Sequence, residues 1–304
     1  MSVSEAVSMN EPRVIAPTFE AAELWRDDFD GAAGECASID YRGRSFDSSA
    51  KRGSWVTDIG DGTGGPGPGW GNDEQEYYID EAVRRDGNGN LVITAERTCD
   101  DNGPEGWREN PRWQYVSGKI TTADRVAFQY GLIEARMHIP TDIGSWSAFW
   151  LLGESLLKGE SWPSCGEIDV VEAVGQRPHE LLGTIHGPGY FADGGLTRTI
   201  TLEQPLSDGF HTYGVLWLPD EIFWLFDGDV YHHLKAADTG DQPWVFNQPF
   251  YAILNLAMGG NLGGDLDESV SASTLLVDFV RHSSVRIQSA GGQWSEPIGS
   301  VFRR

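Results

Sequence analysis

The sequence has few cysteines, no long hydrophobic run and few basic residues. Its three cysteines, Cys36, Cys99 and Cys165, show no metal-ligand spacing and allow at most one disulfide. No stretch reaches the roughly 18 apolar residues that a membrane-spanning helix needs. Residues 1–20 lack the basic start and continuous apolar run of a secretion signal. We therefore expect a soluble chain without a membrane partner.

Basic residues are outnumbered by acidic ones, with 22 Lys and Arg against 46 Asp and Glu, for a net charge of −24. The summed field repels nucleic acid, anionic membranes and other polyanions, and so favours a neutral substrate. A simpler interpretation is that the acidity only keeps the protein soluble. From the charge we expect no nucleic-acid partner.

Short apolar or alternating runs recur along the 304 residues, and turn residues bound most of them. In residues 130–139, Ile133, Ala135 and Met137 alternate with polar neighbours, which is the period of a half-buried strand. No segment shows a sustained helical period, and no internal repeat is visible. The pattern predicts an all-β sandwich of two antiparallel sheets. The other runs are 91–96, 211–218, 221–228, 250–257 and 275–282.

The domain organisation is predicted to be simple. Residues 1–20 are typical of a flexible N-terminal tail, and residues 59–71 form a glycine- and proline-rich loop. No linker divides the remainder. We expect one catalytic domain over 21–290 and a C-terminal extension over 291–304.

The segment GEIDVVE, residues 166–172, carries three carboxylates in an apolar, β-branched run. Strand alternation places Glu167 and Asp169 on one face, pointing away from the core. Glu172 follows at an odd spacing and would face the core in a regular strand. A one-residue β-bulge at Val170 or Val171 reverses the alternation and brings all three acids to one face. An acidic, solvent-facing strand without chemistry is the alternative for this segment taken alone.

The context of this segment resembles glycoside hydrolase family 16, and in particular its laminarinase branch, the endo-β-1,3-glucanases. The resemblance covers residues from about 22 to 288, and its blocks come in the order of that family. They are GWGNDEQEYY (69–78), YVSGKITT (115–122), YGLIEAR (130–136), GSWSAFWLLG (144–153), WPSCGEIDVVE (162–172), GTIHGPGY (183–190), FHTYGVLW (210–217), NLAMGGN (255–261) and VDFVR (277–281).

The resemblance implies a β-jelly-roll sandwich with a concave substrate groove, and hydrolysis with retention of configuration. It implies that Glu167 is the nucleophile and Glu172 the general acid and base, with Asp169 holding the nucleophile's environment. Crowded carboxylates cannot all ionise cheaply, so at least one pKa should be raised enough for that group to donate a proton. No cofactor is required for this chemistry.

Substrate contacts are also implied by the resemblance. Trp146, Trp150 and Trp162 should line the groove, because a sugar ring presents an apolar face to an aromatic plane. Asn72 should hydrogen-bond the sugar, and His186 should lie near the nucleophile. By contrast, we expect Trp217 and Trp224 to pack in the core, and Cys165 to be a packing residue rather than a nucleophile.

Two departures from the family pattern lie where sugar contacts or groove walls are expected. Lys119, a predicted substrate contact, stands where many relatives have Arg and lacks the planar fork of that side chain. Leu262 and Gly263 stand where relatives often have Trp-Pro. Linkage preference and product length therefore remain open.

The family often carries a structural calcium on the convex face. Asp278, within VDFVR, matches the carboxylate ligand, and Asp28 lies near the second position. Oxygen ligands suit calcium, but two aspartates on different strands are equally typical of surface charges.

The expected function is retaining endo-hydrolysis of internal β-1,3 bonds in a neutral β-glucan. One alternative is a non-catalytic β-glucan-binding protein on the same fold. Another is a family 16 hydrolase of a mixed-linkage glucan, galactan or agar. We expect a monomer that meets its polysaccharide outside the cell, although no signal peptide is present in the sequence.

Overall fold

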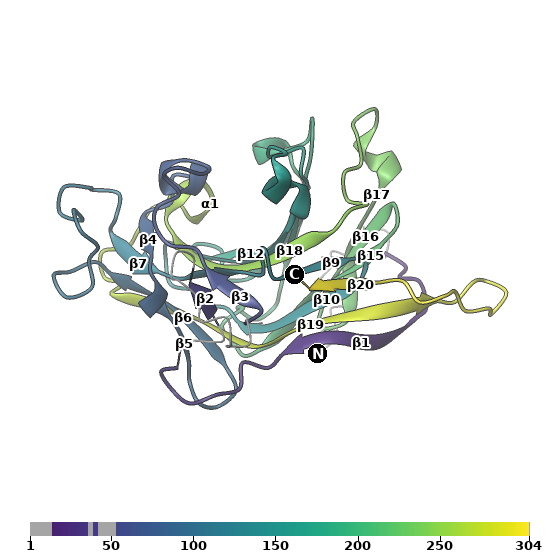
Figure 1. Ribbon diagram of the computed structural model, residues 1–304, viewed down its shortest axis with the longest axis horizontal. Helices are drawn as coiled ribbons and strands as arrows, with labels where there is room; N and C mark the ends of the chain where they lie inside the picture. Colours follow the sequence, from purple (N-terminus) through teal and green to yellow (C-terminus); the bar gives the residue numbers. More distant parts are fainter. Residues whose placement is uncertain (1–13, 36–38, 42–52, 304) are drawn as a thin grey trace.

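The computed structural model describes residues 14–35, 39–41 and 53–303, which form two layered β-sheets (Figure 1). Sheet A has ten strands in the described part of the chain, and β19 lies near its centre. Its order is β17 (Asp229–Lys235), β16 (Glu221–Phe226), β15 (His211–Leu218), β10 (Gly131–His138), β19 (Ala272–Ile287), β6 (Leu91–Arg97), β7 (Tyr115–Ser117) and β4 (Glu76–Tyr78), with β1 (Phe19–Asp27) paired to β19 and β5 (Val83–Arg85) to β6.

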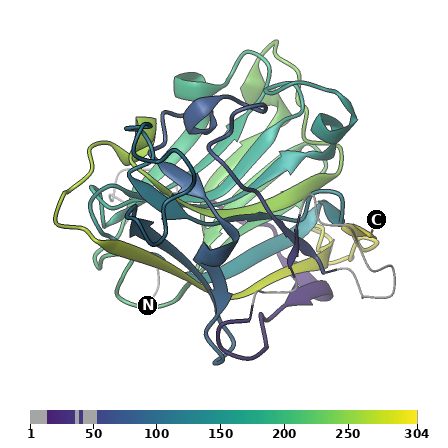
Figure 2. The same cartoon turned by 60° about the vertical axis from the view of Figure 1, so that its left-hand side comes forward.

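Sheet B also has ten described strands, and its long central strands run side by side across the molecule (Figure 2). Pairing is antiparallel in both sheets except between β4 and β7 and between β2 and β3. The order is β14 (Leu196–Thr201), β13 (Glu180–His186), β12 (Glu167–Val174), β11 (Ser145–Gly153), β18 (Phe250–Met258), β8 (Lys119–Thr121), β3 (Trp55–Thr57) and β2 (Ile39–Tyr41), with β9 (Val126–Gln129) paired to β18 and to β20 (Ser300–Arg303). The predicted sandwich is confirmed.

The main core lies between the sheets and follows the predicted alternation. On β10, Ile133, Ala135 and Met137 are fully buried. Glu134 points to the other face, yet it is also buried, because Arg281 of β19 donates to its carboxylate at 2.7 Å. Ion pairing thus accounts for a charge that the strand pattern alone would leave to solvent.

The chain ends add to the sandwich beyond the predicted domain boundaries. Strand β1 begins at Phe19 and pairs along β19, and β20, within the predicted extension 291–304, pairs with β9. Apolar residues near both ends, including Val14 and Ile298, pack on a second cluster with Leu216 and Phe223 of sheet A. Both terminal segments therefore take part in folding the sheets.

Helices are short and lie in the connections. They are η2 (Pro68–Gly71), η3 (Asp80–Ala82), η4 (Glu154–Lys158), η5 (Ala192–Gly194), η6 (Ala236–Thr239) and the single-turn α1 (Gly260–Gly263). None of the helices in the described residues is long and apolar enough to cross a bilayer.

Strand β12 contains the predicted bulge. Its pairing with β11 steps from Val171 opposite Phe149 to Asp169 opposite Trp150, which leaves Val170 as the extra residue. The pairing with β13 is interrupted at the same place, between Asp169 and Glu172. Side chains after the bulge therefore change face relative to a regular strand.

Candidate active site

The three carboxylates of β12 share the face of sheet B that points away from the main core, which we call the active-site face. Ile168, Val171 and Ala173 belong to the core cluster, and the acids alternate with them. Asp169 is 3% exposed, whereas Glu167 and Glu172 are half-buried and open to a ligand. The bulge at Val170 thus places Glu172 beside the other two acids.

Each of the two glutamates accepts a hydrogen bond from an indole. Trp146 Nε1 of β11 donates to Glu172 Oε1 at 3.1 Å, and Trp162 Nε1 donates to Glu167 Oε2 at 3.0 Å. Trp146 is nearly buried, but Trp162 is 41% exposed and packs edge-on against Phe191, with ring centroids 5.6 Å apart. The two indoles hold the acids in place, and Trp162 adds an exposed aromatic surface beside Glu167.

His186 of β13 lies directly opposite Glu167 in the strand pairing. Its Nε2 is 3.2 Å from Asp169 Oδ2 and 3.8 Å from Glu167 Oε1. These three residues also form the one group in the described part of the chain whose ligand atoms lie close enough together to hold a metal ion. The proximity of His186 to Glu167, predicted from GTIHGPGY, is therefore present in the structure.

Burial raises the pKa of Glu167, of Asp169 and of Glu172 to about 8. Repulsion from Asp169 adds to the rise for both glutamates, while His186 and the indole donors lower their pKa. Three adjacent carboxyls titrate as a group, so the first proton lost leaves one negative charge. Glu167 has the Trp162 indole and His186 in contact, and Glu172 has the Trp146 indole; all of these neighbours favour the ionised carboxylates.

The bulge is supported from the opposite sheet. Trp224 of β16 is fully buried, as predicted, and its Nε1 donates to the backbone carbonyl of Asp169 at 2.8 Å. Gly183 of β13 lies against this indole, and a Cβ there would come within 2.4 Å of Trp224 Cδ1. The interrupted ladder leaves a buried carbonyl that needs a donor, and Trp224 supplies it.

The comparisons with known proteins agree with this geometry. The model of glycosyl hydrolases family 16 matches residues 71–280. The chain belongs to glycosyl hydrolase family 16. It is similar to the β-glucanase of Rhodothermus marinus, with 34% identity over 75% of this chain and 78% of that protein. It is also 36% identical to a glucan endo-1,3-β-glucosidase of Cryptopygus antarcticus, over 70% of this chain and 82% of that protein.

Solved structures show the same architecture. The endo-β-1,3-glucanase of Pyrococcus furiosus superposes with a TM-score of 0.74 and 34% identity, over 90% of this chain and 99% of that one. The predicted family, the jelly-roll fold and the assignment as a glycoside hydrolase are confirmed.

The other predicted substrate residues of this family 16 enzyme lie on the same side, but their side chains bind protein groups. Trp150 Nε1 donates to Asn255 Oδ1 at 2.8 Å, and Asn72 Nδ2 donates to Glu74 Oε1 at 3.1 Å. Lys119 is 7% exposed, with its ammonium 3.8 Å from the centroid of the Trp70 ring and 5.2 Å from that of Trp150. Lys119 therefore stabilises the positions of the Trp70 and Trp150 rings by cation–π contacts. Its contact with sugar stays a prediction.

Sequence reasoning missed several residues of this region. Glu74, Tyr78 and Asn255 form a buried polar group behind Asn72 and Trp150, and Trp70 covers Lys119. A signal was present in GWGNDEQEYY, where three acids and two tyrosines follow a glycine-rich loop. Their partners on β18 are about 180 residues away in the sequence, so only the fold brings them together.

Two of the three cysteines, Cys99 and Cys165, lie in the described part of the chain. Cys165 is buried next to the site, and burial together with Glu167 raises the pKa of its thiol to about 12, which confirms packing over nucleophilic reactivity. Cys99 is exposed, and neither residue is in a disulfide. Cys36 lies outside the described residues.

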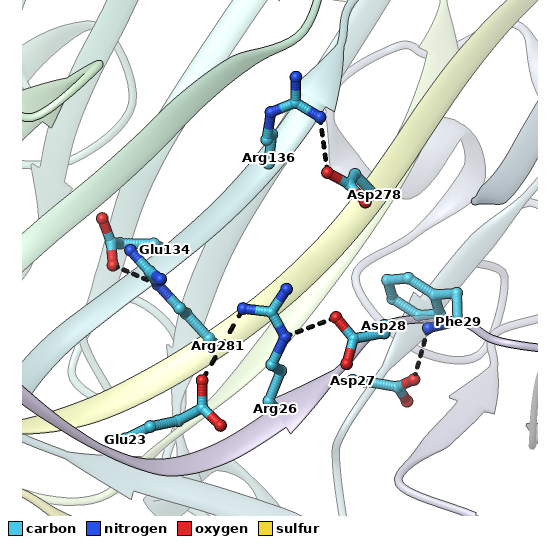
Figure 3. A network of polar contacts seen from close by, with 9 residues as sticks. All are labelled: Glu23, Arg26, Asp27, Asp28, Phe29, Glu134, Arg136, Asp278 and Arg281. Carbon is cyan, nitrogen blue, oxygen red and sulfur yellow. Dashed lines mark hydrogen bonds and ion pairs between the residues drawn. The ribbon is translucent and has the colours of Figure 1, made fainter. Parts of the chain in front are cut away.

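The predicted calcium ligands are engaged in ion pairs on the outer face of sheet A (Figure 3). Asp278 Oδ2 accepts from Arg136 at 2.6 Å, and Asp28 Oδ1 accepts from Arg26 at 2.5 Å. Calcium needs six to eight oxygen ligands, and here both carboxylates face guanidinium groups. As oriented, these side chains do not fit a calcium site. The ion stays a prediction, and no step of the mechanism uses it.

Proposed function

We propose that this family 16 enzyme hydrolyses internal β-1,3 bonds of a neutral β-glucan and retains the anomeric configuration. The observation that carries the proposal is the bulge at Val170, which sets Glu167 and Glu172 on one face, each with an indole donor. Proteins named for endo-1,3-β-glucosidase and endo-β-1,3-glucanase activity are among its relatives, at 34–36% identity. The two carboxylates supply the nucleophile and the acid that retention requires.

In the first step, Glu172 protonates the oxygen of the glycosidic bond while the Glu167 carboxylate attacks the anomeric carbon. The bond to the leaving sugar breaks, and a glycosyl ester forms on Glu167. Loss of the charge on Glu167 removes the repulsion that kept Glu172 protonated. Glu172 is then the base that takes a proton from water, and the water displaces Glu167 with a second inversion.

Asp169 and His186 control where the charge resides. Asp169 is buried beside Glu167, and burial raises the pKa of its carboxyl to about 8, so it adds to the cost of ionising the whole cluster. His186 lies beside both acids and stabilises negative charge on Glu167. We propose that the two residues act by positioning and charge rather than by touching the leaving oxygen.

The neutral substrate is supported by the charge of −24 and by the exposed aromatic pair Trp162 and Phe191. Aromatic faces bind the C–H faces of sugars without needing charge. We also propose that the reaction takes place outside the cell, where a polysaccharide is accessible.

The proposal is tested by incubating the protein with laminarin, lichenan, xyloglucan and agarose and measuring new reducing ends. We expect release from laminarin to be fastest, with oligosaccharides of several lengths as the early products. Glu167→Gln should lower kcat by at least about a thousandfold, since it removes the nucleophile but keeps the shape of the side chain. No release from laminarin, or an unchanged rate in this variant, would refute the proposal.

A further inference from the structure

A second pair of carboxyls, Glu74 and Glu76, lies buried away from the catalytic acids. Glu76, on β4, is fully buried, and Glu74, just before it, is 5% exposed. Glu76 Oε2 accepts from the backbone N–H of Met258 at the end of β18, at 2.7 Å. No donor among the described residues reaches Glu76 Oε1. A buried carboxylate oxygen without a donor is costly, so this atom needs an explanation.

The neighbouring carboxyl supplies that explanation. Burial raises the pKa of Glu76 well above the ordinary value, and Glu74, within hydrogen-bonding reach, raises it further by repulsion, while the Met258 N–H and the Tyr78 hydroxyl oppose the rise. Two ionised carboxylates cannot hydrogen-bond each other, so a proton must lie between them. The other titratable groups nearby are Tyr78, Lys119 beside the Tyr78 ring at 5.9 Å, and Tyr115, paired with Glu76 on β7. The Tyr115 hydroxyl donates to the Val270 carbonyl instead.

Glu74 is in turn the acceptor for two residues. Tyr78 donates its hydroxyl to Glu74 Oε2 at 3.1 Å, and Asn72 donates its amide to Glu74 Oε1 at 3.1 Å. The Tyr78 oxygen accepts from Asn255 Nδ2 at 3.2 Å, which leaves Asn255 Oδ1 to accept from Trp150 Nε1. A negative Glu74 therefore sets the direction of every hydrogen bond from Asn72 to Trp150.

From this geometry we propose that Glu76 keeps a proton and donates a hydrogen bond to Glu74, and that Glu74, as the shared acceptor, positions Asn72 and Trp150 for the sugar. Glu74 and Glu76 are positioning residues, because neither touches the reacting atoms. The effect on sugar binding rests on the proposed function, whereas the shared proton does not.

The proton is tested without substrate, by thermal unfolding of the wild type and Glu76→Gln between pH 5 and pH 8. The glutamine keeps the shape and donates an N–H to Glu74, but it does not titrate. The pKa of a glutamate in the unfolded chain is about 4.3. If the folded state binds the proton of Glu76 more tightly, the protein loses stability as the pH rises from that value to the pKa of Glu76 in the folded state. We expect the unfolding constant of the wild type to rise about tenfold per pH unit relative to the variant.

The matched control is Glu81→Gln, which removes an exposed glutamate from the neighbouring helix η3. Its Tm difference from the wild type should not change with pH. A pH-independent difference for Glu76→Gln as well would show that Glu76 is ionised in the fold, and would overturn the proposal. Failure of laminarin hydrolysis would leave this result intact and would count only against the proposed function.

The positioning role is tested by KM and kcat on laminarin. Glu74→Gln removes the charge from the shared acceptor, and we expect KM to rise about tenfold with little change in kcat, the loss expected for hydrogen bonds to a charged group. Glu81→Gln should keep the wild-type KM. A Glu74→Gln variant with unchanged KM, or with a fall in kcat alone, would overturn the assignment.

Discussion

At the scale of single residues, the two glutamates proposed as catalytic, Glu167 and Glu172, differ in their neighbours rather than in their chemistry. Glu167 has an indole donor and His186 in contact, whereas Glu172 has an indole donor in contact and attraction from the charges of His186 and Arg177. In the proposed mechanism Glu167 carries the charge and Glu172 the proton. The assignment of roles can therefore be tested by removing one donor at a time.

Trp146→Phe keeps the ring but removes the N–H that favours ionised Glu172. We expect the pKa of Glu172 to rise further, so that the alkaline limb of kcat/KM moves to higher pH by roughly half a unit to one unit. A pH profile of initial rates provides the measurement, and an unmoved limb would contradict the role of Glu172 as the acid.

Trp162→Phe is the matched variant, because its N–H favours ionised Glu167 instead. The nucleophile then ionises at higher pH, so the acidic limb should move upward while the alkaline limb stays in place. Movement of the same limb in both variants would mean that the two glutamates do not have separate roles.

At the scale of elements, strand β12 is the part of the fold on which the site depends. In a variant that lacks Val170, the pairing of β12 with both neighbouring strands becomes regular. Asp169 stays opposite Trp150 and Thr184, and Val171, opposite Phe149, becomes the single residue between Asp169 and Glu172. The variant lacking Val170 should keep its acids on one face and retain activity to within about a hundredfold, the cost of a misplacement of roughly 1 Å. Removing Ile168 instead reverses the alternation between Glu167 and Asp169, and activity should be lost. Equal losses in the two deletions, with both proteins folded by circular dichroism, would refute this account of the bulge.

The donor to the bulge has a separate effect on stability. Trp224→Phe keeps most of the packing but leaves the Asp169 carbonyl without its buried donor. We expect the free energy of unfolding to fall by about 1–3 kcal/mol, measured by urea denaturation. No loss of stability would mean that water or another group satisfies that carbonyl.

Much of this element was predictable from sequence. The parity of Glu167, Asp169 and Glu172 required a bulge at Val170 or Val171, and the structure places it at Val170. The donor from Trp224 was not predictable, because the alternation assigns that ring to the core without showing where its N–H points. The Glu74 network was missed for a related reason, since its partners meet only when β4 reaches β18.

At the scale of the whole molecule, the charge of −24 acts on substrates through a long-range field. KM for neutral laminarin should change little between low salt and about 0.5 M salt, where the Debye length falls to a few ångströms. Sulfated laminarin should bind poorly at low salt and better as salt rises. Stronger binding of the sulfated polymer at low salt would show that a local positive surface outweighs the net charge.

The fold as a whole followed from the strand pattern, whereas its limits did not. The sequence placed a domain over 21–290, but β20 joins sheet B beyond that boundary, because its pairing with β9 leaves no signal in hydrophobic alternation.

The central claim is that Glu167 attacks the sugar and Glu172 manages the proton, and trapping the glycosyl intermediate tests it most directly. Glu172→Ala should still react with a β-glucosyl donor whose leaving group needs no acid, but it lacks the base that releases the sugar. Peptide mass spectrometry should then find the added glycosyl mass on Glu167. An adduct on another residue, or none while the donor is consumed with inversion, would contradict the account.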